Sequence, residues 1–515
     1  MHQARRRRGY SALLAALALI VTACGTRLPD NAFVNASSGG NGTAAGTRST
    51  QATAKGATAT TAPGQAGAAG AGATPGATAG ATPGATDAGG GQAAPSGADG
   101  PNQASDTGVT ENEIVIGNIS AEDGILGDAF APPLRGLQAF VQYTNDHGGV
   151  HGRQIRLETC NDSEDRTKNL SCAQDLVENK HVFALLADNS RAEGGSTTYL
   201  YQQNVPVFMG MQISNAAYRF PNYFGIYGTG CPRDGNTVCY GDTLYSESGN
   251  YRWFKEHEGT HKAAVFYYGL IAISADAGQF IMNGLKLEGY DVTGYDVNFA
   301  NPNFDQAVQE MKNNGTDIMF DTIDDGTNRK LCDTMQRYNF SVKAKVSTVV
   351  SYGDEIGSDF SDVCRNSIYI TGSTVSYDAT DNPAVKEFRD AFATYQPDAP
   401  LHQWSLEGWM AGKAFVDALN SMGPAPTRKG LVDWLNNLKG YTNGGLSIPI
   451  DWQQKDYQGM YAQEQSQNQG VYTGDCTAIA QWQDDKQGWV QRTGPQGDCY
   501  DGTWVYPTKA SDRGD

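Results

Sequence analysis

The chain has 515 residues, with 38 basic and 56 acidic side chains and a formal charge of −18 at pH 7. This excess of acid excludes the usual modes of nucleic-acid binding and of attachment to anionic lipid, because both depend on clustered Lys and Arg. The length also exceeds what a single hydrophobic core usually serves, so we expect two lobes.

The first residues have the pattern of an export signal. Four arginines at positions 5–8 precede a short apolar run at 13–21, which is followed by the sequence Thr22-Ala23-Cys24. A basic segment, a short apolar segment and small residues are typical of a secretory signal, and the run is short for a permanent membrane span. The sequence before Cys24 resembles a bacterial lipobox. We therefore predict a lipoprotein signal peptide over 1–23 and a lipid on Cys24, which would anchor the protein to the outer face of the cytoplasmic membrane. An ordinary signal peptide is the alternative.

Residues 24–108 are dominated by Ala, Gly, Thr, Pro and Ser, and the heptad Gly-Ala-Thr-Pro-Gly-Ala-Thr occurs at 72–78 and again at 80–86. Such a segment cannot bury enough apolar surface to offset the entropy of ordering. We predict a disordered tether, with a reach on the order of 50 Å if it behaves as a flexible coil. Its threonines are candidates for glycosylation.

The folded part begins with a strand, a helix and a second strand. Residues 114–119 predict the first strand, Pro132-Pro133 starts a helix with apolar residues at helical spacing, and residues 153–157 alternate into the second strand. Such βαβ units build parallel sheets, in which ligands bind beyond the carboxyl ends of the strands. The loop at 120–128 lies at such an end and contributes two candidate ligand-binding residues, Glu122 and Asp123.

Helices predicted at 169–179 and 195–202 alternate with strands predicted at 182–186 and 205–209. Asn189 and Ser190 follow the first of these strands, where the Ser190 hydroxyl and nearby backbone N–H groups suit an anion such as a carboxylate. The alternative is a serine that only caps its own helix. The next strand ends at Met211 and Gln212, which we expect at the same edge of the sheet.

After a glycine-rich crossing at 225–241, the alternation of helices and strands resumes. Asn303 and Gln306 resemble a capping box, which predicts a helix start. Helices are predicted at 251–258, 278–288 and 407–419, and strands at 263–268, 317–323, 346–350 and 368–371. The tail after Gly444 is rich in Trp, Tyr and Gln and gives no clear pattern.

Eight cysteines besides Cys24 fit an oxidising compartment, and pairing of sequence neighbours is the simplest of 105 connectivities. No Cys-x-x-Cys zinc knuckle occurs. The expected pairs are Cys160–Cys172, Cys231–Cys239, Cys332–Cys364 and Cys476–Cys499.

A search for catalytic motifs gives one candidate, the His-Glu-Gly-Thr-His sequence at 257–261. It matches the zinc-protease pattern, whose chemistry requires one continuous helix. Gly259 and the strand predicted directly afterwards indicate a turn instead. His147 and His151 flank a glycine turn, and Asp321, Asp324 and Asp325 lack the spacing of a calcium loop. We predict no enzyme, no metal and no cofactor, and keep the zinc protease as an alternative.

One stretch resembles a known family. Asn145-Asp-His-Gly-Gly-Val-His-Gly-Arg-Gln-Ile-Arg-Leu157, followed by Ala173-Gln-Asp-Leu-Val177, is similar to the opening of type I periplasmic binding proteins, in the leucine/isoleucine/valine-binding branch that serves ABC importers. The resemblance implies two Rossmann-like α/β lobes, three crossovers and a ligand cleft between the lobes. The first lobe would comprise 109–242 and 371–444, and the second lobe 243–370 and 445–515. It also implies a monomeric solute-binding lipoprotein that delivers a small polar solute to ABC permease subunits. A ligand-sensing receptor on the same fold is the alternative.

The resemblance assigns roles by position. Ser190 matches the first-lobe serine that takes a ligand carboxylate. In the second lobe a Tyr-Gly pair is expected near Ile273-Ser274, where neither residue matches, and the acidic residue for a ligand amino group falls near Val350-Ser351, unless Asp324 or Asp354 replaces it. The complete set of expected ligand residues is Glu122, Asp123, Asn189, Ser190, Met211, Gln212, Asp324 and Ser351.

Overall fold

A computed structural model describes residues 100–124, 128–212, 217, 220–226, 243–450, 452 and 472–509. The predicted signal peptide, the predicted lipid attachment at Cys24, the predicted tether up to residue 99 and the expected Cys231–Cys239 pair lie outside the described residues.

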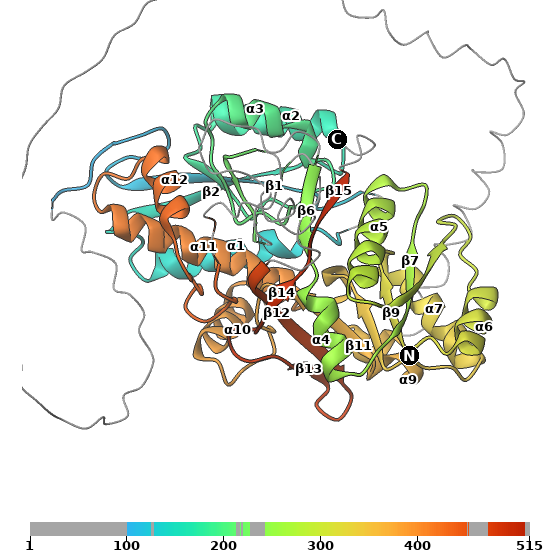
Figure 1. Ribbon diagram of the computed structural model, residues 1–515. Helices are drawn as coiled ribbons and strands as arrows, with labels where there is room; N and C mark the ends of the chain where they lie inside the picture. The colour runs from blue at the N-terminus through green and yellow to red at the C-terminus, as the bar shows by residue number, and fades with distance from the viewer. Residues whose placement is uncertain are drawn as a thin grey trace, which may run out of the picture. The chain divides into compact units, whose positions relative to one another are not determined.

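A parallel five-stranded sheet is built from the first part of the described chain (Figure 1). Its strand order is β2-β1-β3-β4-β5. The predicted βαβ unit opens it and is confirmed. Its elements are β1 (Glu113–Ser120), α1 (Pro132–Asp146), β2 (Gln154–Asn161), β3 (Ala184–Leu186), β4 (Val207–Phe208) and β5 (Tyr223–Phe224).

Helices cover both faces of this sheet. The side chains of β1 show this, since those on one face pack in one hydrophobic cluster and those on the other face pack in another. Ile114 and Ile116 pack with residues of α1 and α11 (Gln403–Met422). Val115 and Ile119 pack on the opposite side with α2 (Arg166–Gln174) and α3 (Thr197–Gln202). Two short turns, η2 (Asp175–Asn179) and η3 (Glu193–Gly195), complete that layer. Burial on both faces is what a parallel sheet requires.

Helix α11 packs along α1, so the chain returns to the first sheet after residue 372. The two helices lie side by side in Figure 1. Their backbones approach so closely that a Cβ on Gly136 would lie 1.8 Å from the carbonyl oxygen of Ser405, and one on Gly408 would lie 1.9 Å from that of Pro133. Glycine is therefore required on both helices. Helices α10 (Pro383–Tyr395) and α12 (Arg428–Asn437) extend this layer.

The second sheet has the order β13-β12-β11-β10-β9-β7-β8, with β7 to β11 parallel and β12 antiparallel to β11. The structure therefore shows two α/β lobes, and the lobe boundaries at 242, 370 and 444 remain a prediction. The parallel strands of the second sheet are β7 (Lys262–Tyr267), β8 (Asp291–Asp296), β9 (Ile318–Asp321), β10 (Ala344–Ser347) and β11 (Ile368–Gly372). The helices before and between these strands are α4 (Gly249–His257), α5 (Ala272–Leu287), α6 (Asp305–Asn314), α7 (Asp325–Arg337), η5 (Val349–Ser351), α8 (Ile356–Asp359) and α9 (Asp362–Arg365).

The tail that gave no clear pattern supplies strands. β12 (Tyr472–Gln483) and β13 (Gly488–Gln491) extend the second sheet, and β14 (Asp498–Thr503) pairs with β12. The last strand, β15 (Val505–Lys509), pairs with β6 (Thr243–Glu247), the strand that leads into α4.

The Gly-Gly-x-x-Gly-Arg turn has a structural role. Gly148, Gly149 and Gly152 all have positive φ, which glycine adopts without strain. The Arg153 side chain is fully buried, and its Nε and Nη2 donate to the carbonyls of Thr110 (2.8 Å) and Pro424 (2.5 Å). The turn thus ties the segment before β1 to the end of α11.

The predicted capping box is wrong. Phe304, and not Asn303, is the N-cap residue of α6, and Asn303 Oδ1 accepts from the N–H of Asp305 (2.9 Å) in a local turn. The side chain of Gln306 therefore has no capping position to fill.

Three disulfides are present in the described residues: Cys160–Cys172, Cys332–Cys364 and Cys476–Cys499. They join sequence neighbours, as expected. Among the helices of the described residues, none combines the length and the apolar character that crossing a membrane needs.

Candidate functional site

The carboxyl ends of β1, β3 and β4 meet at one edge of the first sheet, as predicted. The N–H of Ala121 donates to the carbonyl of Asn189 (3.0 Å), and the N–H of Met211 donates to that of Asp188 (2.9 Å). The structure therefore brings Asn189, Ser190 and Met211 together with the loop after β1.

The side chains of Asn189 and Ser190 are nevertheless engaged within the protein. Asn189 is fully buried, and its Nδ2 donates to the carbonyl of Phe130 (3.2 Å). Ser190 is 1% exposed, its Oγ accepts from the N–H of Ala192 (3.0 Å), and its hydroxyl lies near enough to the Asp162 carboxyl to lower the pKa of that group. This geometry supports the local alternative for Ser190, although as a turn and not as a helix cap, because η3 begins only at Glu193.

Buried acids surround Ser190. Burial raises the pKa of Asp188 well above its ordinary value, and the nearby Glu193 and Asp162 add to the effect. Burial likewise raises the pKa of Asp162, although hydrogen bonds from Ser190 and Asn169 oppose it. A ligand carboxylate beside Ser190 would face these acids, so this edge is poorly suited to an anion.

The other first-lobe candidates divide by exposure. Met211 and Gln212 are buried, and Gln212 Nε2 donates to the carbonyl of Ala217 (3.1 Å). Glu122 and Asp123 are exposed. Hydrogen bonds from Ser163 and Asn161 lower the pKa of Asp123. The loop after β1 therefore offers carboxylates to the solvent.

In the second lobe, Tyr268-Gly269 directly follows β7, so the expectation of a Tyr-Gly pair near Ile273-Ser274 is wrong in position. The latter residues lie in α5, where Ser274 Oγ accepts from the N–H of Tyr268 (2.8 Å). The sequence predicts Tyr268 as the last residue of the strand at 263–268, because it continues an aromatic run, and so does not indicate it as a site residue. The glycine after it was the available signal.

Tyr268 and Asp324 form a pair at the ends of β7 and β9. Tyr268 Oη donates to Asp324 Oδ2, and Phe299 packs edge-on against the Tyr268 ring, with 5.1 Å between ring centroids. Asp324 is also the N-cap of α7, since its Oδ1 accepts from the N–H of Thr327 (3.1 Å) and its Oδ2 from Thr327 Oγ1 (2.8 Å). The positional match to type I periplasmic binding proteins predicts Asp324 as a site residue but does not predict that Tyr268 is its partner.

Asp324 is held as a carboxylate. Burial acts to raise its pKa, but the hydrogen bonds from Tyr268 and Thr327 outweigh burial, and the net pKa is lowered. These donors are neutral, so they stabilise the charge without cancelling it.

The remaining second-lobe candidates are less available. Ser351 is 1% exposed and its Oγ donates to Asp325 Oδ1 (3.1 Å). Asp354, the other proposed replacement acid, accepts from Tyr377 Oη at its Oδ1 (2.6 Å).

Two cavities lined by described residues lie elsewhere, and the predicted ligand residues line neither of these two. One lies where β11 and β12 meet Gln403 and Glu407 of α11, and has room for about one water molecule. The other is a surface groove between α1 and α10, beside Tyr143, His147 and Lys386.

A family model described as "Periplasmic binding protein" matches residues 113–487, well over half of the chain. The chain belongs to the periplasmic binding protein family.

Solved structures agree on the fold of this periplasmic binding protein. A possible leucine/isoleucine/valine-binding protein from Rhodopirellula baltica is 13% identical at a TM-score of 0.55, covering 74% of this chain and 96% of that one. A leucine binding protein from Thermotoga maritima (12%, TM-score 0.55, 74% and 97%) and a fatty acid ABC transporter substrate-binding protein from Thermomonospora curvata (14%, TM-score 0.55, 80% and 95%) are similarly close. No curated protein matches the sequence.

The His-Glu-Gly-Thr-His sequence of the binding protein lies in a turn, so the zinc-protease alternative lacks its geometry. α4 ends at His257, whose ring stacks on Trp253, and Gly259 has a φ of 58°. Glu258 Oε1 accepts from Tyr369 Oη (2.9 Å). Among the described residues, no group of three His, Cys, Asp or Glu side chains is placed to hold a metal ion.

Proposed function

We propose that this protein is the solute-binding component of an ABC importer and that its solute is small and carries an amino group. Asp324 is the observation that carries the proposal: a partly buried carboxylate with neutral hydrogen-bond donors, at the strand ends of the second sheet. A ligand ammonium would supply the missing positive charge through a charge-assisted hydrogen bond. The name of one similar structure, a leucine binding protein, fits an amine-bearing solute, whereas the name of another, a fatty acid ABC transporter substrate-binding protein, does not.

The mechanism is binding without chemistry. Solute contacts both lobes, and it favours the closed arrangement by the difference between its affinities for the closed and open states. The permease then takes the solute from the closed form. A lipid on Cys24 and the tether would keep the protein beside the permease, at the outer face of the cytoplasmic membrane.

A thermal-shift panel of amino acids, diamines, amides, sugars and fatty acids tests the proposal. We expect stabilisation only by amine-bearing solutes, and a ligand at about 100 times its dissociation constant should add roughly 2.7 kcal/mol. Stabilisation by sugars or fatty acids alone would contradict the proposed class.

Asp324→Asn sharpens this test, because Asn is as good an N-cap as Asp but carries no charge. We expect the variant to keep the N-cap bond to the Thr327 N–H, to have a slightly lower thermal midpoint because its amide NH2 group cannot accept from Tyr268 and Thr327, and to lose the response to amines. Asp305→Asn is the matched control: it removes an exposed acid from the start of α6, and should leave the response intact.

A further inference from the structure

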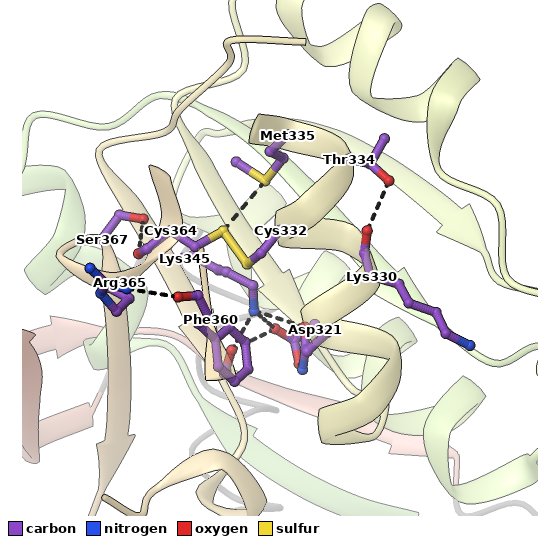
Figure 2. The surroundings of a disulfide bond; sticks show 12 residues. Asp321, Lys330, Cys332, Thr334, Met335, Lys345, Phe360, Cys364, Arg365 and Ser367 are labelled. Atoms are coloured by element: carbon purple, nitrogen blue, oxygen red, sulfur yellow. Dashed lines mark hydrogen bonds and ion pairs between the residues drawn. A yellow bond between two sulfur atoms is a disulfide. The ribbon is translucent and has the colours of Figure 1, made fainter. Parts of the chain in front are cut away.

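A buried lysine joins the ends of two strands in the second lobe. Lys345 lies in β10, its side chain is 0% exposed, and its Nζ lies 2.5 Å from Asp321 Oδ2, 2.8 Å from Asn328 Oδ1 and 2.5 Å from Ser347 Oγ. Figure 2 shows the Lys345 amine directed at Asp321. All three possible donor positions of the ammonium are therefore in use.

The partners of Lys345 also bond to one another. Asn328 Nδ2 donates to Asp321 Oδ1 (2.8 Å), and Ser347 Oγ lies 2.7 Å from Asp321 Oδ2. A buried ion pair adds little net stability compared with apolar residues of the same volume, whereas it does fix the geometry of the groups that bond to it.

The cluster lies directly behind the candidate site. Asp321 ends β9, three residues before Asp324, and Asn328 lies in the first turn of α7, which Asp324 caps. Ser347 ends β10, ahead of Ser351, whose hydroxyl bonds Asp325 at the start of α7. Lys345 thus connects the two loops that carry the candidate ligand residues.

A second anchor holds the same helix. Cys332 lies one turn beyond Asn328 on the same face of α7 and forms the disulfide with Cys364 of α9 (Figure 2). The disulfide fixes the middle of the helix, and the Lys345 cluster fixes its start, where Asp324 lies.

We propose that Lys345 is a positioning residue of the ligand site: its ammonium locks the ends of β9 and β10 to the first turn of α7, and so holds the Tyr268–Asp324 pair in its binding geometry. This inference rests on the proposed function for its effect on affinity, but its effect on the two loops does not depend on any ligand.

The test compares three full-length variants. Lys345→Met leaves Asp321 as a buried charge without its cation and should lower stability. Lys345→Met with Asp321→Asn removes both charges and should recover most of the thermal midpoint. Lys343→Met makes the same chemical change at an exposed position just before β10, where Lys343 Nζ bonds only the Gly259 carbonyl.

Hydrogen exchange provides the readout that needs no ligand. In the double variant we expect amides at 322–328 and 348–352 to exchange about tenfold faster or more, with unchanged exchange in α1 and α11, despite the recovered midpoint. If Lys345 only stabilised the fold, the protection of these amides in the double variant would recover together with the thermal midpoint. Unchanged protection of both loops in the double variant would overturn the proposal.

Affinity is measured with L-leucine and putrescine as probes. If either binds the wild type, the double variant should bind it about tenfold more weakly or worse, as is typical when supporting contacts behind a site are removed, and Lys343→Met should bind normally. Equal affinity of the double variant and the wild type would contradict the positioning role. If neither probe binds the wild type, the proposed amine ligand class is in doubt, and hydrogen exchange still decides the role of Lys345.

Discussion

Asp188 is a carboxyl group that the fold withdraws from water at the end of β3. Its Oδ1 accepts from the N–H of Ile119 (2.9 Å), which favours the charged form, but burial and the neighbouring acids Glu193 and Asp162 prevail and its pKa is raised well above 3.8. The folded state therefore binds a proton at Asp188 more tightly than the unfolded state does.

This shift predicts how Asp188→Asn depends on pH. Because the folded pKa lies above the unfolded value, the stabilisation from Asp188 is complete below about pH 4 and is lost as the pH rises through the folded pKa. Asn keeps an acceptor for Ile119 and carries no charge. We expect the variant to gain stability relative to the wild type as the pH rises above about 4, by about 1.4 kcal/mol for each pKa unit by which the folded value exceeds the unfolded one. Urea denaturation across this range measures the gain, and a difference independent of pH would contradict it.

Ser190→Ala tests the local role of that hydroxyl. The substitution leaves the Ala192 N–H without its buried acceptor, while the Asp162 carboxyl keeps its hydrogen bond from Asn169 Nδ2 (2.8 Å), so we expect the unfolding free energy to fall by about 1–2 kcal/mol. Ser171→Ala on the exposed side of α2 removes only a bond to the Thr167 carbonyl and should cost much less. A variant with wild-type stability and weakened ligand binding would restore Ser190 as a ligand contact.

At the level of elements, the contact between α1 and α11 joins the second half of the chain to the first sheet. Gly408→Ala would place a methyl group against the Pro133 carbonyl, where no side chain can yield. We expect a loss of about 1–3 kcal/mol, the range found for overpacked cores. Asn420→Ala, at an exposed position of α11, should be neutral or slightly stabilising. Chemical denaturation of both variants measures the difference in unfolding free energy. Equal stability of the two variants would show that α1 and α11 can move apart without a measurable loss of stability.

Helical periodicity and βαβ spacing were enough to predict α1, α11 and the parallel strands other than β5 and β8, because these signals are local. The tail strands β12 and β15 could not be predicted in this way, since their partners β11 and β6 lie about one hundred residues or more away in the chain, and β13 and β14 pair with β12. The candidate site was found in part for the same reason. Strand ends identified Asn189, and the positional match to the family identified Asp324. The contact of Ser190 with Asp162 and the pairing of Tyr268 with Asp324 depend on tertiary structure.

At the scale of the whole molecule, β15 joins distant parts of the chain. It pairs with β6, and its Val505 and Tyr506 side chains are buried, with Tyr506 Oη donating to the Phe280 carbonyl (3.2 Å). The family match ends at residue 487, so this strand lies beyond the part that the family model describes.

Truncation after Thr503 tests the contribution of β15. Burying side chains of this size contributes about 1.5–3 kcal/mol each, so for Val505 and Tyr506 we expect a loss of about 3–6 kcal/mol relative to a chain truncated after Lys509. Tryptophan fluorescence during urea denaturation reports the two midpoints. Identical midpoints would show that β6 holds its place without β15.

The antiparallel pairing of β12 with β11 has a consequence for biosynthesis. A ribosome finishes β11 about one hundred residues before it finishes the strand that covers it, so a newly made chain presents an unpaired backbone edge during that interval. Such edges invite association with other nascent chains. Correct production of this protein should therefore depend on chaperones that shield the growing chain until its final segment has emerged.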